Sequence, residues 1–385
     1  MYLRQNKRRA ITVMLLVLAL LMVGIGGLAC VQGLQPIGWS GGAVSGDTLF
    51  VGSKEGRLVA VNMVDEGRQW SEQLKVSSQS GGFGCAPTLG GGCGAGAAKV
   101  AIYGTPAIAG ELVYISAYNG KVYAYNTDSL GVRWVYPREG YLEPIVSGVA
   151  TDGENVYFGG SDGKVYALDA ATGDWQWEFQ TGDKVWSTPT IADGRVYIGS
   201  FDNKLYTLDA GDGSLIWEFT SEGAIAATPL VDGSTVYIGS FDRHFYAVDV
   251  ADGSMKWQFM GSNWFWAKPV VNDTTIYVGC LDGKVYALQA DSGDKVAEFD
   301  LGSPVASSPV ALNGAIVFAS REGVIYRLDT ASNEIGQLAA VEAEVYGSLT
   351  INNGVVYIHT PDLTLHRVNA ETGAVLMSVS LESKD

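Results

Sequence analysis

The side chains that most often do chemistry are few and scattered in this chain of 385 residues. The three histidines, His244, His359 and His366, do not share the spacing of a metal site. No HExxH motif, nucleophile elbow, phosphate-binding loop or GxGxxG fingerprint occurs. Asp-rich turns such as 169–174 lack the spacing of an EF-hand loop, and an aspartate that caps its own turn explains them. We therefore expect no catalytic residue, no metal site and no cofactor.

A recurring aromatic position is the strongest candidate for binding. It lies three residues before the proline, or its equivalent, that opens each of eight similar units. The aromatic residues at this position are Trp39, Tyr103, Trp186, Trp266 and Tyr346. Directly behind them come small and hydroxyl residues, with Lys268 the one charge. Such rings can anchor a protein, a peptide or a sugar if the fold brings them together.

Whether the fold brings these rings together depends on a 40-residue unit that repeats along the chain. Five tyrosines stand 40 residues apart, at Tyr166, Tyr206, Tyr246, Tyr286 and Tyr326. The unit 189–220 holds four short β-rich runs separated by turn residues. Eight such units predict an all-β, eight-bladed β-propeller of four-stranded antiparallel blades. An N-terminal hydrophobic signal or anchor helix is expected to precede it.

A second aromatic column, in the fourth run of the blades, is typical of packing. It comprises Trp70, Trp134, Trp177, Trp217 and Trp257. Blades six to eight carry Ala297, Gln337 and Met377 there instead. We expect each ring to plug the gap to a neighbouring blade, where its burial contributes about 2–3 kcal/mol.

In a propeller, the aromatic residues that precede the first strands should lie at the central channel and not between blades. Because the first strand of each blade is innermost, these rings should form an aromatic funnel at the mouth of the central channel. Hairpins on the same face add an acidic rim of Asp162, Asp202, Asp242, Asp282, Glu322 and Asp362. Turn chemistry also explains the aspartates, and packing between first strands also explains the rings.

The recurring P-x-[IV], V-Y-[IV]-G-S, D-G-K-[VL]-Y-A-L-D-A, T-G and W-x-F segments resemble the pyrroloquinoline-quinone-type (PQQ-like) propeller repeat, over roughly residues 37–381. That superfamily contains quinoprotein dehydrogenases and non-catalytic scaffolds, including the propeller lipoprotein of the bacterial outer-membrane β-barrel assembly complex. The dehydrogenases are typically longer, and many have a vicinal cysteine pair that is absent from this sequence. The resemblance therefore implies a scaffold. A quinone-dependent oxidoreductase, a cofactor-binding sensor and a glycan-binding module are the alternatives.

The N-terminus predicts a protein of the cell envelope. Residues 10–29 are uncharged and mostly apolar, and they follow a basic segment, so the propeller should lie outside the cytoplasm. Cys30 stands where a lipoprotein would be cleaved and lipidated, and an uncleaved membrane anchor fits equally well. Residues 1–30 are thus interpreted as a signal peptide or anchor, and residues 31–385 as the propeller domain.

The remaining cysteines and the charge agree with this interpretation. Cys85 and Cys93 flank a short segment of a glycine-rich insertion at 71–100, and we expect them to form a disulfide, with two free thiols as the alternative. Cys280 replaces a small strand residue and should be a buried thiol. The net charge of −16 argues against binding nucleic acid. We expect a non-catalytic, membrane-tethered propeller that binds protein or peptide partners on the extracytoplasmic face, with a role in envelope protein assembly.

Overall fold

The computed structural model describes residues 40–74, 100–312 and 314–382, and every regular element in them is a β-strand. These strands form eight four-stranded sheets, each built from four strands that are consecutive in the chain. Neighbouring strands within a sheet are antiparallel. The predicted all-β, eight-bladed propeller is therefore confirmed.

Each blade takes its strands in chain order. The first four are blade 1 (β1 Gly42–Ser45, β2 Thr48–Gly52, β3 Leu58–Asn62, β4 Arg68–Trp70), blade 2 (β5 Ala107–Ala109, β6 Leu112–Ala117, β7 Lys121–Asn126, β8 Val132–Tyr136), blade 3 (β9 Ala150–Thr151, β10 Asn155–Gly159, β11 Lys164–Asp169, β12 Trp175–Gln180) and blade 4 (β13 Thr190–Ala192, β14 Arg195–Gly199, β15 Lys204–Asp209, β16 Leu215–Thr220). The other four are blade 5 (β17 Leu230–Asp232, β18 Thr235–Gly239, β19 His244–Asp249, β20 Met255–Met260), blade 6 (β21 Val270–Asn272, β22 Thr275–Gly279, β23 Lys284–Gln289, β24 Lys295–Asp300), blade 7 (β25 Val310–Leu312, β26 Ala315–Ala319, β27 Val324–Asp329, β28 Glu334–Ala340) and blade 8 (β29 Thr350–Asn352, β30 Val355–Thr360, β31 Thr364–Asn369, β32 Val379–Ser380).

Several predicted features lie outside the described residues: the N-terminal signal or anchor helix, Cys30, Trp39, Cys85, Cys93 and most of the insertion at 71–100. By its contacts the chain divides into Met1–Gln35 and Pro36–Asp385, and the described residues all belong to the second unit. Nowhere in the described ranges is there a helix with the length and apolar character needed to cross a bilayer.

Burial explains why the second and third runs of each unit are almost continuously apolar. In β14, Val196, Tyr197 and Ile198 are all buried, because neighbouring blades cover both faces of the sheet. The fourth strand instead alternates exposed and buried residues, as expected for the outer edge of a blade. Asn203 turns the chain between β14 and β15 with a φ of 72°, a conformation that asparagine tolerates.

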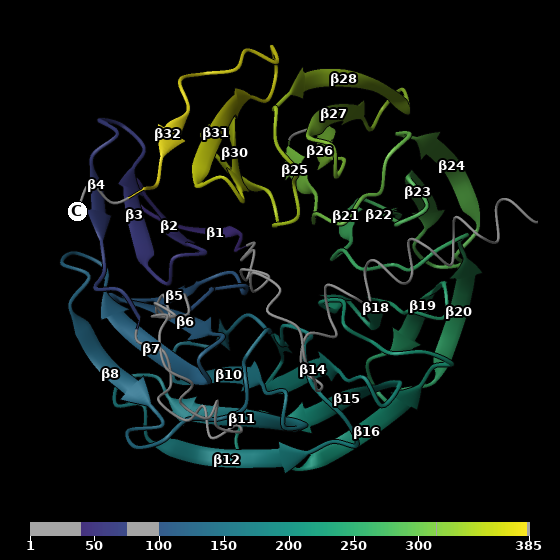
Figure 1. The fold of residues 1–385 in the computed structure, drawn as a ribbon. Helices are drawn as coiled ribbons and strands as arrows, with labels where there is room; N and C mark the ends of the chain where they lie inside the picture. Colours follow the sequence, from purple (N-terminus) through teal and green to yellow (C-terminus); the bar gives the residue numbers. More distant parts are fainter. Residues whose placement is uncertain (1–39, 75–99, 313, 383–385) are drawn as a thin grey trace, which may run out of the picture. The chain divides into compact units, whose positions relative to one another are not determined.

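Within the unit Pro36–Asp385 the blades form a ring (Figure 1). First strands such as β1 and β25 face its centre, and fourth strands such as β8, β12 and β16 lie outside. The ring closes where blade 8 meets blade 1, and among the described strands none is exchanged between them. The Gly42 amide donates to Thr350 Oγ1 over 3.1 Å, and Arg367 pairs with Glu66 over 2.5 Å.

The core consists of apolar layers between neighbouring blades, and the fourth-strand tryptophans contribute to four of them. Trp177 of blade 3 packs with residues of blade 4, and its indole N–H donates to the Ala210 carbonyl over 2.9 Å. The same bond to the following blade recurs for three other rings, Trp134, Trp217 and Trp257. The predicted role as interblade plugs is confirmed for these four residues.

Trp70 departs from the column, and a missing β-bulge is the reason. In blade 3 a bulge between Ala167 and Leu168 places Trp177 opposite Ala167. Blade 1 has no such bulge, so Trp70 pairs one position earlier, opposite Val59. A one-residue change of register turns a side chain to the other face of the sheet. Trp70 therefore packs against blade 8 and donates to the Leu381 carbonyl over 3.0 Å.

Candidate binding site in the central channel

The segments that lead into the eight first strands line one cavity of about 390 Å³. It contains Tyr103, Trp186, Trp266, Tyr346 and Lys268, so the structure brings these predicted site residues together. The four rings come from blades 2, 4, 6 and 8, while Val146, Ala226 and Ala306 occupy the same position in blades 3, 5 and 7. Alternation of large and small side chains lets the rings fit around a narrow axis.

Trp186 and Trp266 belong to a continuous aromatic cluster over blades 4 to 6. Trp186 meets Phe201 edge to face, with ring centroids 4.7 Å apart, and Phe201 meets Phe241 at 5.8 Å. Phe241 stacks on Trp266 at 5.5 Å and on Trp264 at 4.3 Å. All five side chains are partly exposed. Rings that pack against one another and stay partly exposed are suited to contact a partner.

Three members of this cluster, Phe201, Phe241 and Trp264, were not predicted as site residues. Phe201 and Phe241 directly precede the hairpin residues Asp202 and Asp242, 40 residues apart, which is a signal that the sequence does contain. Whether these two residues contact the aromatic funnel depends on how the hairpin loops lie beside the first-strand segments.

The tyrosines on the other side of the cavity are held by polar and aromatic neighbours. The Arg321 guanidinium lies 5.0 Å from the Tyr346 ring centroid and also donates to its hydroxyl over 2.7 Å. The same hydroxyl donates to Glu344 over 2.8 Å. Burial raises the pKa of Tyr346. Tyr103 lies 5.5 Å from the ring of the exposed Tyr118. These contacts hold the two rings in place at the cavity.

Lys268 is the single charged residue that lines the cavity, as far as the described chain extends. Hydroxyl residues surround the same level of the channel: Thr105, Thr188, Thr228, Ser308 and Ser348. The Lys268 backbone amide donates to Ser308 Oγ over 3.1 Å. Burial lowers the pKa of the Lys268 ammonium, because desolvation disfavours the charged form.

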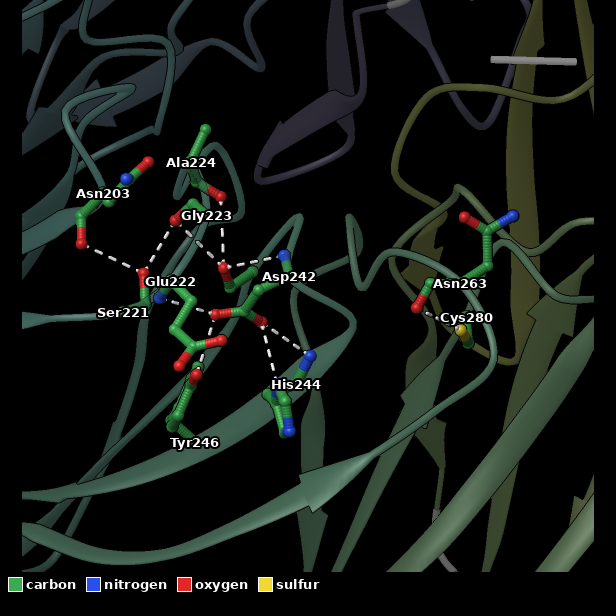
Figure 2. A network of polar contacts seen from close by, with 11 residues as sticks. Asn203, Ser221, Glu222, Gly223, Ala224, Asp242, His244, Tyr246, Asn263 and Cys280 are labelled. Atoms are coloured by element: carbon green, nitrogen blue, oxygen red, sulfur yellow. Dashed lines mark hydrogen bonds and ion pairs between the residues drawn. The ribbon is translucent and has the colours of Figure 1, made fainter. Parts of the chain in front are cut away.

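Four of the six acidic rim residues brace the blades. Figure 2 shows Asp242, which accepts hydrogen bonds from the His244 amide (2.7 Å), the Tyr246 hydroxyl (2.7 Å) and the Glu222 amide of the preceding loop (2.9 Å). Its side chain is only 5% exposed. Burial is the main factor that raises the pKa of Tyr246, and the hydrogen bond to Asp242 raises it further.

The other rim residues follow two patterns. Asp162, Asp202 and Asp282 accept the same bonds from their own turn and from the tyrosine four residues on. Glu322 and Asp362 are exposed. Bonds within the turn thus explain four of the carboxylates, and three of these, Asp202, Asp242 and Asp282, also accept a bond from the loop of the preceding blade.

The remaining candidate side chains that the structure describes include a buried thiol and a buried histidine. Cys280 is a buried free thiol, as predicted, and burial raises its pKa to about 12. Its sulfur lies 3.3 Å from the Asn263 carbonyl oxygen (Figure 2). In the ranges that the structure describes, no three His, Cys, Asp or Glu side chains are grouped to hold a metal ion. His359 is buried, with Nδ1 3.0 Å from the Ser40 carbonyl oxygen.

Eight four-stranded blades built on a 40-residue repeat, around a channel lined by aromatic and hydroxyl residues, define a propeller of the PQQ-like repeat class. The family model described as outer membrane protein assembly factor BamB matches residues 26–184, 176–304 and 281–384. The chain belongs to this family.

Solved structures support the fold. The crystal structure of BamB from Moraxella catarrhalis is 22% identical, with a TM-score of 0.53, covering 60% of this chain and 72% of that chain. The computationally designed protein Ika8 is 16% identical, with a TM-score of 0.66, covering 86% of this chain and 95% of that chain. No curated protein matches the sequence.

Proposed function

We propose that this protein is a non-catalytic scaffold that binds a protein or peptide partner in the cell envelope through the mouth of its central channel. The observation that carries the proposal is the gathering of Tyr103, Trp186, Trp266 and Tyr346 in one cavity. Partly exposed aromatic anchors in a recessed centre are the usual carriers of binding energy in protein interfaces. The BamB family suggests a role in outer-membrane protein assembly.

The proposed location is the extracytoplasmic face of the membrane. It rests on the basic segment and apolar run that end at Cys30. Mass spectrometry of the protein from the membrane fraction distinguishes the two forms of tether. A lipidated chain would begin at Cys30 and carry added acyl mass, whereas an uncleaved anchor would retain residues 1–29.

The binding site is tested by replacing both channel tryptophans, Trp186→Ala with Trp266→Ala, and capturing crosslinked partners from intact envelopes. We expect partner capture to be lost, while the melting temperature stays close to that of the wild type. Trp175→Ala is the matched control, because that ring is 53% exposed on the outer strand β12, away from the channel. Wild-type capture by the double variant, or its unfolding, would show that the rings serve packing only.

The oxidoreductase alternative has a separate test. A quinone site should change the absorbance spectrum of pyrroloquinoline quinone when protein and calcium are added together. We expect no change. A saturable spectral shift at stoichiometric protein would instead favour a cofactor-binding function.

A further inference from the structure

Lys268 stands at a position where the other blades carry no charge. The equivalent residues in the described blades are small or hydroxyl-bearing: Thr105, Gly148, Thr188, Thr228, Ser308 and Ser348. Lys268 follows Trp266 by two residues, on the segment that leads into β21. Lys268 also borders a second cavity, together with residues of β17 and β21, and none of the four channel rings lines that cavity. The one cation of the cavity is thus set behind its aromatic entrance.

The ammonium of Lys268 lacks the compensation that other lysines receive. Lys164 pairs with Glu178 over 2.6 Å, and Lys204 pairs with Glu218 over 2.5 Å. In the described part of the chain, no carboxylate or carbonyl oxygen is bonded to the Lys268 side chain, and only its backbone amide is engaged. Removing an ammonium from water without a partner is costly. A lysine in this state is suited to an anion supplied from outside.

The surroundings select a singly charged anion. Neutral hydroxyls such as Thr228 and Ser308 can donate hydrogen bonds, but no arginine lines the cavity in the described ranges. Phosphate groups are usually bound by forked guanidinium donors or several cations. Asp232 lines a second cavity that also reaches Lys268, and its charge opposes a multiply charged ligand.

We infer that the channel binds the C-terminal carboxylate of a partner's peptide chain, with Lys268 as its counter-ion. The inference rests on the proposed function and names the part of the partner that enters. A cavity of about 390 Å³ is near the lower end of ligand pockets and holds a few residues, not a folded domain. A chain end passes the aromatic ring as a single strand, whereas a loop with an internal acidic side chain must pass twice. The carboxylate at the tip then reaches the level of Lys268 while the preceding side chain meets Trp186 and Trp266.

Calorimetry with two matched peptides tests this inference. The probes are acetyl-Gly-Gly-Phe with a free carboxylate and the same peptide as its C-terminal amide. We expect the full-length protein to bind the free acid about tenfold or more tightly than the amide. Lys268→Met should bind both peptides equally and weakly, because it keeps the length of the side chain and removes the charge. Lys184→Met is the matched control, since Lys184 lies 5.5 Å from the Trp186 ring at the exposed mouth, and it should keep the preference.

A second measurement follows the Lys268 side chain directly in the wild-type protein. In lysine-labelled protein, the Lys268 resonance, identified by its absence from Lys268→Met, should shift when the free acid is added and stay in place with the amide. Equal binding of acid and amide, a preference that survives in Lys268→Met, or an unmoved Lys268 resonance would overturn the inference. An amidated peptide with an internal glutamate that binds as tightly as the free acid would also overturn it. Partner capture by the Trp186 and Trp266 variant is independent of these results, so the scaffold proposal can stand if the carboxylate site fails.

Discussion

The joints between blades fall into two groups, with and without a tryptophan from the preceding blade, and the turn residue that faces the joint differs between them. Following blades 2 to 5, a tryptophan lies on a turn glycine of the next blade: Gly173, Gly213, Gly253 and Gly293. At three of the other four joints the same turn position is Glu66, Leu130 or Asn333. At the fourth it is Gly373, where a Cβ would lie 2.1 Å from the Leu338 carbonyl oxygen of blade 7. Glu66, Leu130 and Asn333 are thus the non-glycine residues of this turn. These residues also have positive φ, between 51° and 62°. Positive φ alone therefore does not require glycine at this turn.

What the neighbouring blade places beside the turn makes the difference. A Cβ on Gly213 would lie 2.5 Å from the Trp177 ring, so any larger residue would displace it. Leu130 shows the alternative solution, because its side chain is buried in the layer between blades 1 and 2 that Trp70 leaves unfilled. A glycine that is usually explained by its own turn is here explained by the neighbouring blade.

The largest effect is expected from removing a ring of the first group. Trp217→Ala should lower the free energy of unfolding by about 3–5 kcal/mol, because it opens a cavity between blades and removes one of the two donors to the Val250 carbonyl, the other being Arg195. Chemical denaturation of this variant and of the exposed control Trp175→Ala gives the comparison. Equal stability of the two variants would show that Trp217 does not fill the joint.

The ring and the glycine should be energetically coupled. Gly213→Ala should cost about 1–3 kcal/mol, because the new methyl group collides with Trp177. Gly194→Ala is the matched control: its φ of 71° is close to the 74° of Gly213, but nothing lies within 4 Å of its added Cβ. Combining Gly213→Ala with Trp177→Ala should reduce the cost of the alanine to that of the control. A cost that is unchanged in the double variant would contradict the coupling.

The joint between blades 8 and 1 should weaken in mild acid. Burial lowers the pKa of His359, which lies against Ser40 at this joint, so the native protein holds this residue neutral. The unfolded chain then binds the proton more readily, and stability falls as the pH drops below about 6.5. Urea denaturation at pH values on either side of that point should show this loss in the wild type and a smaller loss in His359→Gln. An identical pH dependence in both proteins would exclude His359 as the source.

The smallest expected effect is the absence of a reaction. Because Cys280 is fully buried and its pKa is raised to about 12, iodoacetamide should modify it only after unfolding. Cys85 and Cys93 should resist modification until a reductant is added, as a disulfide would. Mass spectrometry of the alkylated native protein checks both statements. Labelling of Cys280 in the folded state would mean that blade 6 opens.

The repeat made the fold predictable, and the exceptions arise from geometry that the repeat does not encode. Trp70 follows the aligned third-strand position by the same 11 residues as Trp177. It nevertheless packs against the preceding blade in the ring, whereas Trp177 packs against the following one. The difference is a bulge, which changes the pairing without changing the residue count. Spacing alone could not reveal it.

The candidate site shows the same limit. Trp186 and Trp266 could be placed in the channel because they precede the innermost strands by a constant number of residues. Phe201 and Phe241 come from hairpins, and Trp264 from an interblade connection, so only their packing in space joins them to the funnel. The hairpin aspartates could be located from the sequence, but their partners across the joint, such as the Glu222 amide, could not.

The closure of the ring has a consequence for how this molecule can come apart. Every sheet keeps its four strands on one side of the joint between blades 8 and 1, so separating these blades breaks no β-ladder. What holds them is a set of side-chain contacts, including Arg367 with Glu66 and Trp70 with the Leu381 carbonyl, over an apolar layer. The ring can therefore open at this joint by the separation of two folded blades, and neither blade has to unfold.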